Sequence, residues 1–399
     1  MAQRRTSTKV TTPGARQGRR PLATAARAVS AVKGRALVGG LAVVAAIAAG
    51  AALLSQPAAE PTPLPTPGLG DVPMAEAWPG VTASAPQVGV LDDNTTYTPR
   101  LYLNTQLSVG IARTPDGETH RLLTRAADGR ITELRRVAGS RDPNFNGFAA
   151  SGDVLVWAET TTGGPANQLT TIWRADLKTG AVRSLTADTG NAVFRKSGFD
   201  VVIAEGAAHW VSGGNIKTIP AEVRSIPLAG GKVTRRTVPT LLSLSTWPWL
   251  TTAESAVSVP ATIFNLKTGK SQVVRSSPSE SIRCRPSWCR IGVVGSSGIS
   301  RTDMMRPDGA ERRRIAGPNA AAVMNDIGLF DRFEALGVSE GPEKGTITLQ
   351  LVDLARQQTV RIAEGAAVVE SQGSLLWWAE GLPGREYKWR ALDLSAIPA

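Results

Sequence analysis

From about residue 98 onward, the chain repeats one pattern: a short apolar or alternating run, a turn rich in Gly, Asp or Asn, and a returning run. The clearest copies lie at 173–182, 226–233, 263–270 and 305–311. A glycine in such a turn accepts the positive φ that a tight hairpin imposes. The turn glycines stand at 180, 231, 269 and 309, at intervals of 51, 38 and 40 residues. The chain is therefore expected to be built from repeated hairpins of nearly constant size.

The runs between these turns are rich in β-branched and aromatic residues, and none keeps a 3.6-residue period over the length of a helix. They predict strands. Strand hairpins that repeat at 40 to 50 residues are typical of a β-propeller, in which each blade holds about four strands. We therefore predict an all-β fold, a single β-propeller over residues 98–399.

Counting the turn units predicts six blades, and a seventh follows if residues 98–137 form a blade of their own. The last blade would hold 375–379 and 387–394 as its second and third strands, which leaves five residues, too few for an outer strand. We expect an N-terminal strand within 100–137 to complete it. Such closure hides strand edges that would otherwise pair with other chains.

Residues 36–54 form a run of nineteen residues without a charge, the length that a helix needs to cross a bilayer. Residues 1–35 carry nine Lys or Arg and no acid, which predicts a cytoplasmic tail and an extracytoplasmic remainder. The sequence thus predicts a transmembrane signal anchor and a single-pass protein of the cell membrane. A cleaved signal peptide is the alternative, because the run is weakly apolar, and Arg19-Arg20 faintly resembles a twin-arginine signal.

Residues 55–97 are expected to form a linker, because eight prolines recur between 57 and 86 and favour a semi-rigid, extended chain. The net charge of +12 belongs mainly to the tail. Beyond residue 35 the chain has 36 basic and 33 acidic side chains, a net of +3. This balance argues against nucleic acid as a partner of the outer domain, while the tail would favour an anionic leaflet.

The hairpins of the form strand–Asp-Leu-x-x-Gly, such as 176–180, resemble those of the bacterial TolB-like, WD40-like six-bladed propellers of the cell envelope. With the N-terminal anchor, the chain is similar to the membrane-tethered propeller proteins of actinomycetes. The resemblance covers about residues 98–399 and rests on the style of the repeat, since the Trp-Asp and Gly-His pairs of true WD40 repeats are absent. It implies extracytoplasmic binding or scaffolding and carries over no catalytic residue.

Cys284 and Cys289 are the only cysteines, and outside the membrane an even pair at this spacing predicts a disulfide. A redox role of thiols flanked by arginines is the alternative. Zinc needs about four ligands, and the chain offers only two histidines besides the cysteines. His120 is expected on an exposed hairpin and His209 in the core. No Gly-x-Ser-x-Gly motif accompanies them, so we predict no catalytic triad.

Two further motifs have competing interpretations. Residues 142–147 followed by Asp153 match the outline of a calcium loop, although an Asx-rich turn leading into a strand explains them equally. The tryptophans of Trp247-Pro248-Trp249 and Trp377-Trp378 are expected to send one ring of each pair into the core. They serve either inter-blade packing or a rim platform for a partner or glycan.

The scarcity of catalytic groups favours a binding or scaffolding module whose partner is a protein or an envelope polymer. We predict no cofactor, no metal and no catalytic residue. The alternative is a propeller hydrolase, of lactonase or glycosidase type, that gathers carboxylates at the central channel. Three or more acids at one channel mouth would favour the enzyme, and a narrow, uncharged channel would favour the binding module.

Overall fold

The computed structural model describes residues 71–162, 168–213, 221–238, 242–253, 256–296, 298–341, 345–381 and 387–399. The predicted tail and anchor lie outside these residues. None of the helices within them is long and apolar enough to cross a membrane. The described residues belong to one compact unit, Pro63–Ala399, and its regular structure is almost entirely strand. The described helices are α2 (Met74–Ala77), η1 (Gly139–Arg141) and η2 (Leu394–Ala396).

Backbone hydrogen bonds join the strands into six sheets, five of which have four antiparallel strands. The first two sheets contain β3 to β6 (Thr96–Asn104, Leu107–Arg113, Thr119–Ala126, Ile131–Ala138) and β7 to β10 (Asn144–Ser151, Val154–Thr162, Gln168–Asp176, Val182–Thr186). The next two contain β11 to β14 (Val201–Ala204, Ala207–Ser212, Ala221–Pro227, Thr234–Val238) and β15 to β18 (Leu242–Leu244, Trp249–Thr252, Ala261–Asn265, Ser271–Val274). The fifth contains β19 to β22 (Glu280–Cys284, Cys289–Gly295, Gly298–Met305, Arg313–Ala316).

The sixth sheet has eight strands because the long strand β26 (Gln358–Gln372) belongs to two units. Its first half pairs with β25 and its second half with β27. The remaining strands of this sheet are β1 (Val72–Pro73), β2 (Gln87–Val88), β23 (Ala320–Ala322), β24 (Phe333–Ser339), β25 (Ile347–Asp353), β27 (Leu375–Glu380) and β28 (Lys388–Asp393). The double sheet thus consists of a unit from β23 to β26 and a unit from β26 to β28 with β2.

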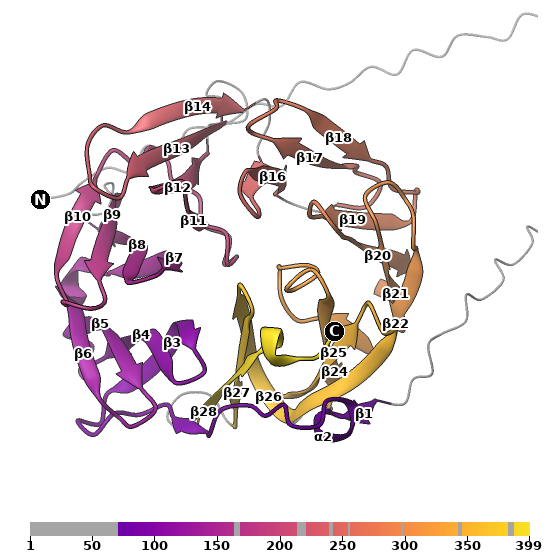
Figure 1. Ribbon diagram of the computed structural model, residues 1–399, viewed down its shortest axis with the longest axis horizontal. Coiled ribbons are helices and arrows are strands. Elements are labelled where there is room, and N and C mark those ends of the chain that lie inside the picture. Colours follow the sequence, from indigo (N-terminus) through magenta and orange to yellow (C-terminus); the bar gives the residue numbers. More distant parts are fainter. Residues whose placement is uncertain are drawn as a thin grey trace, which may run out of the picture. The chain divides into compact units, whose positions relative to one another are not determined.

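Figure 1 shows the sheets set around a common centre, with β3, β7 and β11 innermost in their sheets. The predicted β-propeller is confirmed, as six sheets of which one is double. The strands from Thr96 to Ala138 form a sheet of their own, which is the arrangement that the sequence left open as a seventh blade. The turn glycines take the positive φ expected of them, for example +73° at Gly180 and +69° at Gly269.

The expected closing strand within 100–137 is wrong. The outer strand of the last unit is β2, which pairs with β28 so that Gln87 faces Trp389. The predicted linker boundary at residue 98 is also too late, because the chain is already part of the propeller at Val72, where β1 runs parallel to β26. Proline did not exclude these two-residue strands because such short pairings need few N–H donors.

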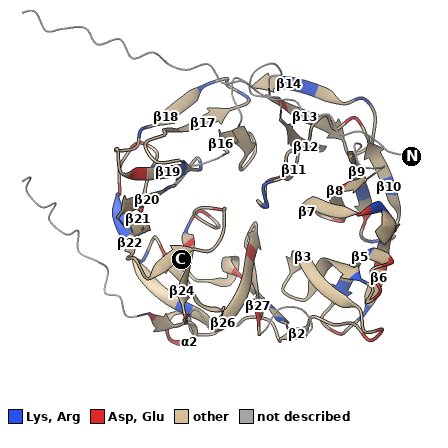
Figure 2. Cartoon of the chain, turned by 180° about the vertical axis from the view of Figure 1, so that it is seen from behind, with Lys and Arg blue, Asp and Glu red and all other residues tan. Residues whose placement is uncertain are grey.

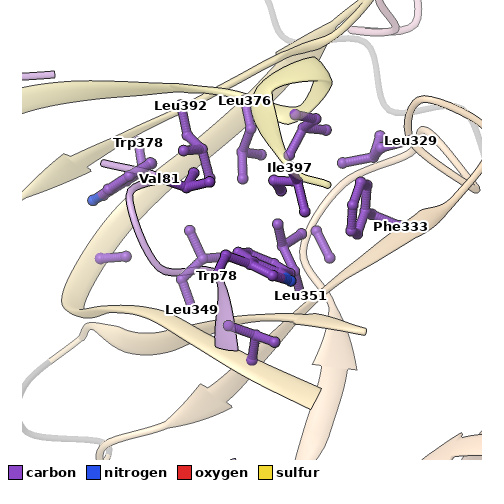
Figure 3. Close-up of a cluster of buried hydrophobic side chains, with 14 residues drawn as sticks. Trp78, Val81, Leu329, Phe333, Leu349, Leu351, Leu376, Trp378, Leu392 and Ile397 are labelled. Atoms are coloured by element: carbon purple, nitrogen blue, oxygen red, sulfur yellow. The ribbon is translucent and has the colours of Figure 1, made fainter. Parts of the chain in front are cut away.

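The segment between β1 and β2 contributes to the core. Trp78 is fully buried, and its ring meets Phe333 edge to face at 5.7 Å between centroids. Figure 3 shows Trp78 and Val81 among side chains from both halves of the double sheet, including Leu351, Leu376 and Trp378. The N-terminal segment therefore packs between the two units that it helps to join.

Tryptophans fill the space between neighbouring units. Trp377 and Trp378 lie on opposite faces of β27, as strand alternation requires, but both are buried. Trp377 packs near Tyr102 of β3, with 5.7 Å between ring centroids, whereas Trp378 belongs to the cluster around Trp78. Both faces of a blade are covered in this fold. Both tryptophans of this pair are therefore buried, where only one was expected to be.

Several of the outermost strands, namely β6, β10, β14 and β22, carry cations. Figure 2 shows blue segments on β14 and β22, which contain Arg235, Arg236, Arg313 and Arg314. Charged side chains on an edge strand disfavour pairing with another chain. The ring is thus closed by β2, and charge protects the edges of these outer strands.

Candidate functional site

A cavity of about 480 Å³ lies at the centre of the ring, among the innermost strands β3, β7 and β26. The chain before β11 and the chain after β23 complete its wall. Its charged lining residues are Arg100, Lys196, Arg290, Asp200, Asp326 and Glu370. The central cavity therefore holds three acids, the number expected to favour an enzyme, but three cations lie in the same wall.

Residues 195–200, which lead into β11, cross toward the opposite side of the ring (Figure 1). Asp326 receives hydrogen bonds from the Ser197 hydroxyl at 2.8 Å and from the Gly198 amide at 3.1 Å. Gln372 of β26 donates from its side-chain amide to the carbonyls of Gly198 and Phe148, both at 2.8 Å. These bonds fix the crossing segment between units that are more than 100 residues apart in sequence.

Glycine at position 198 is required by this close approach. A Cβ there would lie 3.0 Å from the Ser371 carbonyl oxygen and 3.1 Å from a carboxylate oxygen of Asp326. The carboxylate oxygen of Asp326 already accepts the Gly198 amide. A side chain at this position would therefore require its neighbours to shift by a few tenths of an ångström.

Two of the three cavity acids serve this segment. Asp200 accepts backbone hydrogen bonds from Arg195 at 2.8 Å and Ser197 at 3.2 Å, and burial raises the pKa of its carboxyl to about 6. Asp326 also pairs with Arg285 at 2.7 Å. Their oxygens are therefore engaged in holding the fold, which is a structural and not a chemical task.

Glu370 is the remaining acid. Its side chain is 37% exposed and lies 3.9 Å from Arg100, a distance at which attraction in water is weak. Burial against the cavity wall raises its pKa, and the charges of Arg100 and Lys196 oppose that effect. Glu370, Arg100 and Lys196 are thus the charged groups of the central cavity that remain able to meet a ligand.

Arg290, in contrast, is bound within the wall. It donates from Nε to Glu334 at 2.6 Å and from Nη2 to the Asp326 carbonyl at 2.6 Å. Glu334 is fully buried and also accepts the Gly328 amide at 3.0 Å. This buried pair fixes the turn between β23 and β24, because removing either partner would leave an uncompensated charge.

A second cavity, of about 620 Å³, lies where the innermost strands end. It shares Asp326, Ser371 and Gln372 with the central cavity. Its aromatic lining residues are Phe199, Trp247, Trp249, Trp288 and Phe330, and we call it the aromatic cavity. The tryptophans of the Trp247-Pro248-Trp249 motif therefore line a concave surface and do not only pack between blades.

The predicted disulfide is confirmed. Cys284 ends β19, Cys289 begins β20, and the two face each other across the strand pair. The bond closes the turn 285–288, which lines the aromatic cavity. It fixes a segment of the wall by a covalent link.

The calcium interpretation fails on geometry. Asn144 and Asn146 lie within β7, and Asp153 lies in the turn that follows it. An extended strand spreads its side chains over two faces and several residues, so these oxygens do not surround one point. Among the described residues no group of three or more His, Cys, Asp or Glu is placed to hold a metal ion.

The two histidines are structural. His209 is 5% exposed, stacks on Trp247 at 3.8 Å between ring centroids, and hydrogen-bonds to the Ser225 hydroxyl and the Ala204 carbonyl. Its expected place in the core is confirmed. His120 was expected on an exposed hairpin but lies buried on β5, where burial and Arg113 lower its pKa.

Sequence reasoning missed Arg100, Lys196, Glu370 and Gln372. Each lies on or beside an innermost strand, and what distinguishes these strands is their position in the ring. Alternation along a strand does not reveal which face or end looks into the centre. In the sequence these four residues look like the many other polar residues near turns, so no local pattern distinguishes them.

No protein-family model matches this chain, and no curated protein matches it. Solved structures do match. The β-propeller domain of the trilobed protease from Pyrococcus furiosus is 11% identical, with a TM-score of 0.50 over 75% of this chain and 95% of that one. Puromycin hydrolase is 14% identical, with a TM-score of 0.49 over 84% of this chain and 55% of that one.

A puromycin-hydrolysing peptidase of Mycobacterium tuberculosis is 13% identical, with a TM-score of 0.46 over 79% of this chain and 55% of that one. The match thus spans about half the length of these two hydrolases. At such low identities the likeness concerns the backbone and transfers no residue role. The strand pairing, together with the likeness to the propeller domain of the trilobed protease, identifies the described part of this chain as a β-propeller.

Proposed function

We propose that this protein is a binding module of the cell envelope that receives its ligand in the channel of an extracytoplasmic propeller. The anchor predicted at 36–54 would hold it at the membrane. The proposal rests on how the three acids of the central cavity are bonded. Two of the three hold the crossing segment, which leaves Glu370 beside Arg100 and Lys196 as groups suited to recognition.

The hydrolase alternative needs more than these groups provide. Glycoside hydrolysis by the usual route uses two carboxyls on either side of the bond, one as acid and one as base or nucleophile. With Asp200 and Asp326 engaged by backbone amides and by Arg285, Glu370 has no such partner in the central cavity. A binding role needs only complementary charge, shape and accessible space.

The TolB-like resemblance supports the same proposal, because its hairpin style is found in envelope propellers that bind or scaffold. A protein or an envelope polymer is the proposed partner. The mixed charges of Arg100, Lys196 and Glu370 favour a ligand with both donors and acceptors.

The test is capture from detergent-solubilised envelopes by immobilised full-length protein, followed by mass spectrometry and sugar analysis. Asn146, which lines the central cavity, is replaced by Trp to fill it, and exposed Ile299 on β21 is replaced by Trp as the matched control. We expect one captured component that Asn146→Trp loses and Ile299→Trp keeps. Capture that is the same in all three proteins would contradict a channel ligand.

A parallel assay measures turnover of chromogenic esters, lactones and glycosides. We expect no activity that depends on the channel. Turnover that Glu370→Gln abolishes, with folding intact, would instead establish the hydrolase.

A further inference from the structure

The aromatic cavity is much richer in aromatic residues than the chain around it. Phe, Trp and Tyr make up 5% of the sequence, yet five of the residues around this one cavity are aromatic. Its volume of about 620 Å³ lies within the range of about 300 to 1,000 Å³ that is common for small-ligand sites. Packing alone does not explain open space between large apolar rings.

Phe330 gives the clearest sign of a binding role. It lies in the turn between β23 and β24, 51% exposed, with a φ of +50°. Asp331 follows with a φ of +56°, and a bulky residue in this left-handed region strains the backbone. Glycine would relieve the strain, and half of the Phe330 surface stays outside the core. A ring kept in a strained position at the wall of a cavity therefore indicates contact with a ligand.

The polar groups of this cavity are arranged among the rings. Arg285 stacks on Phe199, with its guanidinium carbon 4.0 Å from the ring centroid, and pairs with Asp326 at 2.7 Å. Because these two charges neutralise each other, the pair adds no net charge to the cavity wall. Ser287 and Ser374 add hydroxyls to the lining.

A pyranose ring matches this combination. Its C–H faces are apolar and slightly positive, so they stack on the negative face of an aromatic ring, and its hydroxyl edges need planar or hydroxyl partners. We propose that the aromatic cavity binds a carbohydrate, with Phe330 and Trp249 against the sugar faces and Arg285, Ser287 and Ser374 near its hydroxyls. This inference rests on the proposed function and names a ligand class for the cavity that borders the central cavity at Asp326, Ser371 and Gln372.

Two other ligand classes fit less well. A purely apolar molecule would cover the Ser287 and Ser374 hydroxyls and the Arg285 guanidinium without offering them a hydrogen bond, which is unfavourable. An anion would meet the carboxylates of Asp326 and Asp331 in the same wall. A neutral glycan avoids both penalties.

The experiment uses full-length protein in detergent micelles and isothermal titration with oligomers of N-acetylglucosamine, glucose, mannose and galactose. We expect saturable binding of at least one oligomer, weakened at least tenfold by Phe330→Gly. Because glycine accepts the positive φ, the same variant should keep or raise the melting temperature. Phe330→Tyr should retain binding, and Ile299→Ala, an equally exposed apolar side chain on β21, should bind like the wild type.

Three results would overturn the assignment: no oligomer binds, Phe330→Gly binds as tightly as the wild type, or that variant loses both binding and thermal stability. The envelope capture separates this failure from failure of the proposed function. If capture is blocked by Asn146→Trp while no sugar binds, the glycan assignment fails and the binding module stands. If capture is also unaffected, both fail.

Discussion

At the scale of single residues, Asp200 links the crossing segment to pH. Its folded pKa is raised to about 6, mainly by burial, from an ordinary value of 3.8. The folded protein therefore holds this proton more tightly than the unfolded chain. The associated stability is fully present below about pH 4 and is lost as the pH rises through about 6.

We predict that the difference in free energy of unfolding between wild type and Asp200→Asn changes by up to about 3 kcal/mol between pH 4 and pH 7. The wild type should lose stability relative to the variant as the pH rises, in urea titrations at several pH values. Asp188→Asn is the control with the opposite sign, because Arg235 lowers the pKa of Asp188. A pH-independent difference for Asp200→Asn would show that its carboxyl titrates as in the unfolded chain.

The disulfide leads to a second residue-scale prediction. Its cysteines are five positions apart, and the chain-entropy account gives so short a loop about 2 kcal/mol. Replacing Cys284 and Cys289 together by Ser should lower the melting temperature without abolishing folding. The check is calorimetry, together with alkylation of protein purified without reductant. Modification of both thiols in the wild type would mean that the disulfide is absent in the isolated protein.

At the scale of elements, the N-terminal segment is the joint of the ring. Trp78 is fully buried between the two halves of the double sheet, and loss of such a side chain typically costs about 3 to 5 kcal/mol. We predict a loss of this size for Trp78→Ala in denaturant unfolding. Val88→Ala, on the 51% exposed side chain of β2, should change stability by less than about 0.5 kcal/mol. Equal effects of the two substitutions would contradict the proposal that the N-terminal segment joins the two halves of the double sheet.

The closing strand is tested by removing one donor. The Gly89 amide donates to the Tyr387 carbonyl at 2.7 Å, just beyond β2. Gly89→Pro removes this N–H, so we expect faster hydrogen exchange in β28 and aggregation through its uncovered edge. Light scattering and exchange mass spectrometry measure the two effects. A monomeric variant with unchanged protection in β28 would show that β2 does not close the ring.

These elements also show what the sequence could predict. Turns such as Asp176 to Gly180 can be predicted from the sequence, because glycine is the residue that tolerates the φ they need. The strands follow from the spacing between these turns. β2 is only two residues long within a proline-rich stretch, and β26 serves two units at once. Neither feature leaves a pattern in the sequence, because closure of the ring determines which strands β2 and β26 pair with. The residues of the central cavity were hidden for the same reason.

At the scale of the whole molecule, the net positive charge and the folded propeller lie in different parts of the chain. The described arginines are largely paired within or between sheets, as in the bidentate pair of Arg135 with Glu159 at 2.8 and 2.9 Å. The excess positive charge stays in residues 1–35. A basic tail inside and a nearly neutral propeller outside would let the tail meet anionic lipids while the propeller meets an envelope ligand.

This division predicts a topology that can be measured. A reporter active only outside the cytoplasm should work when fused after Ala399, because nine cations precede the apolar run 36–54 and no acid does. Protease added to wall-stripped cells should digest the propeller and spare a tagged tail. If the mature protein lacks residues 1–54, the run is a cleaved signal peptide and the propeller is released from the membrane. If the propeller resists protease until the cells are lysed, it lies in the cytoplasm, and the envelope ligand proposed for its channel is out of reach.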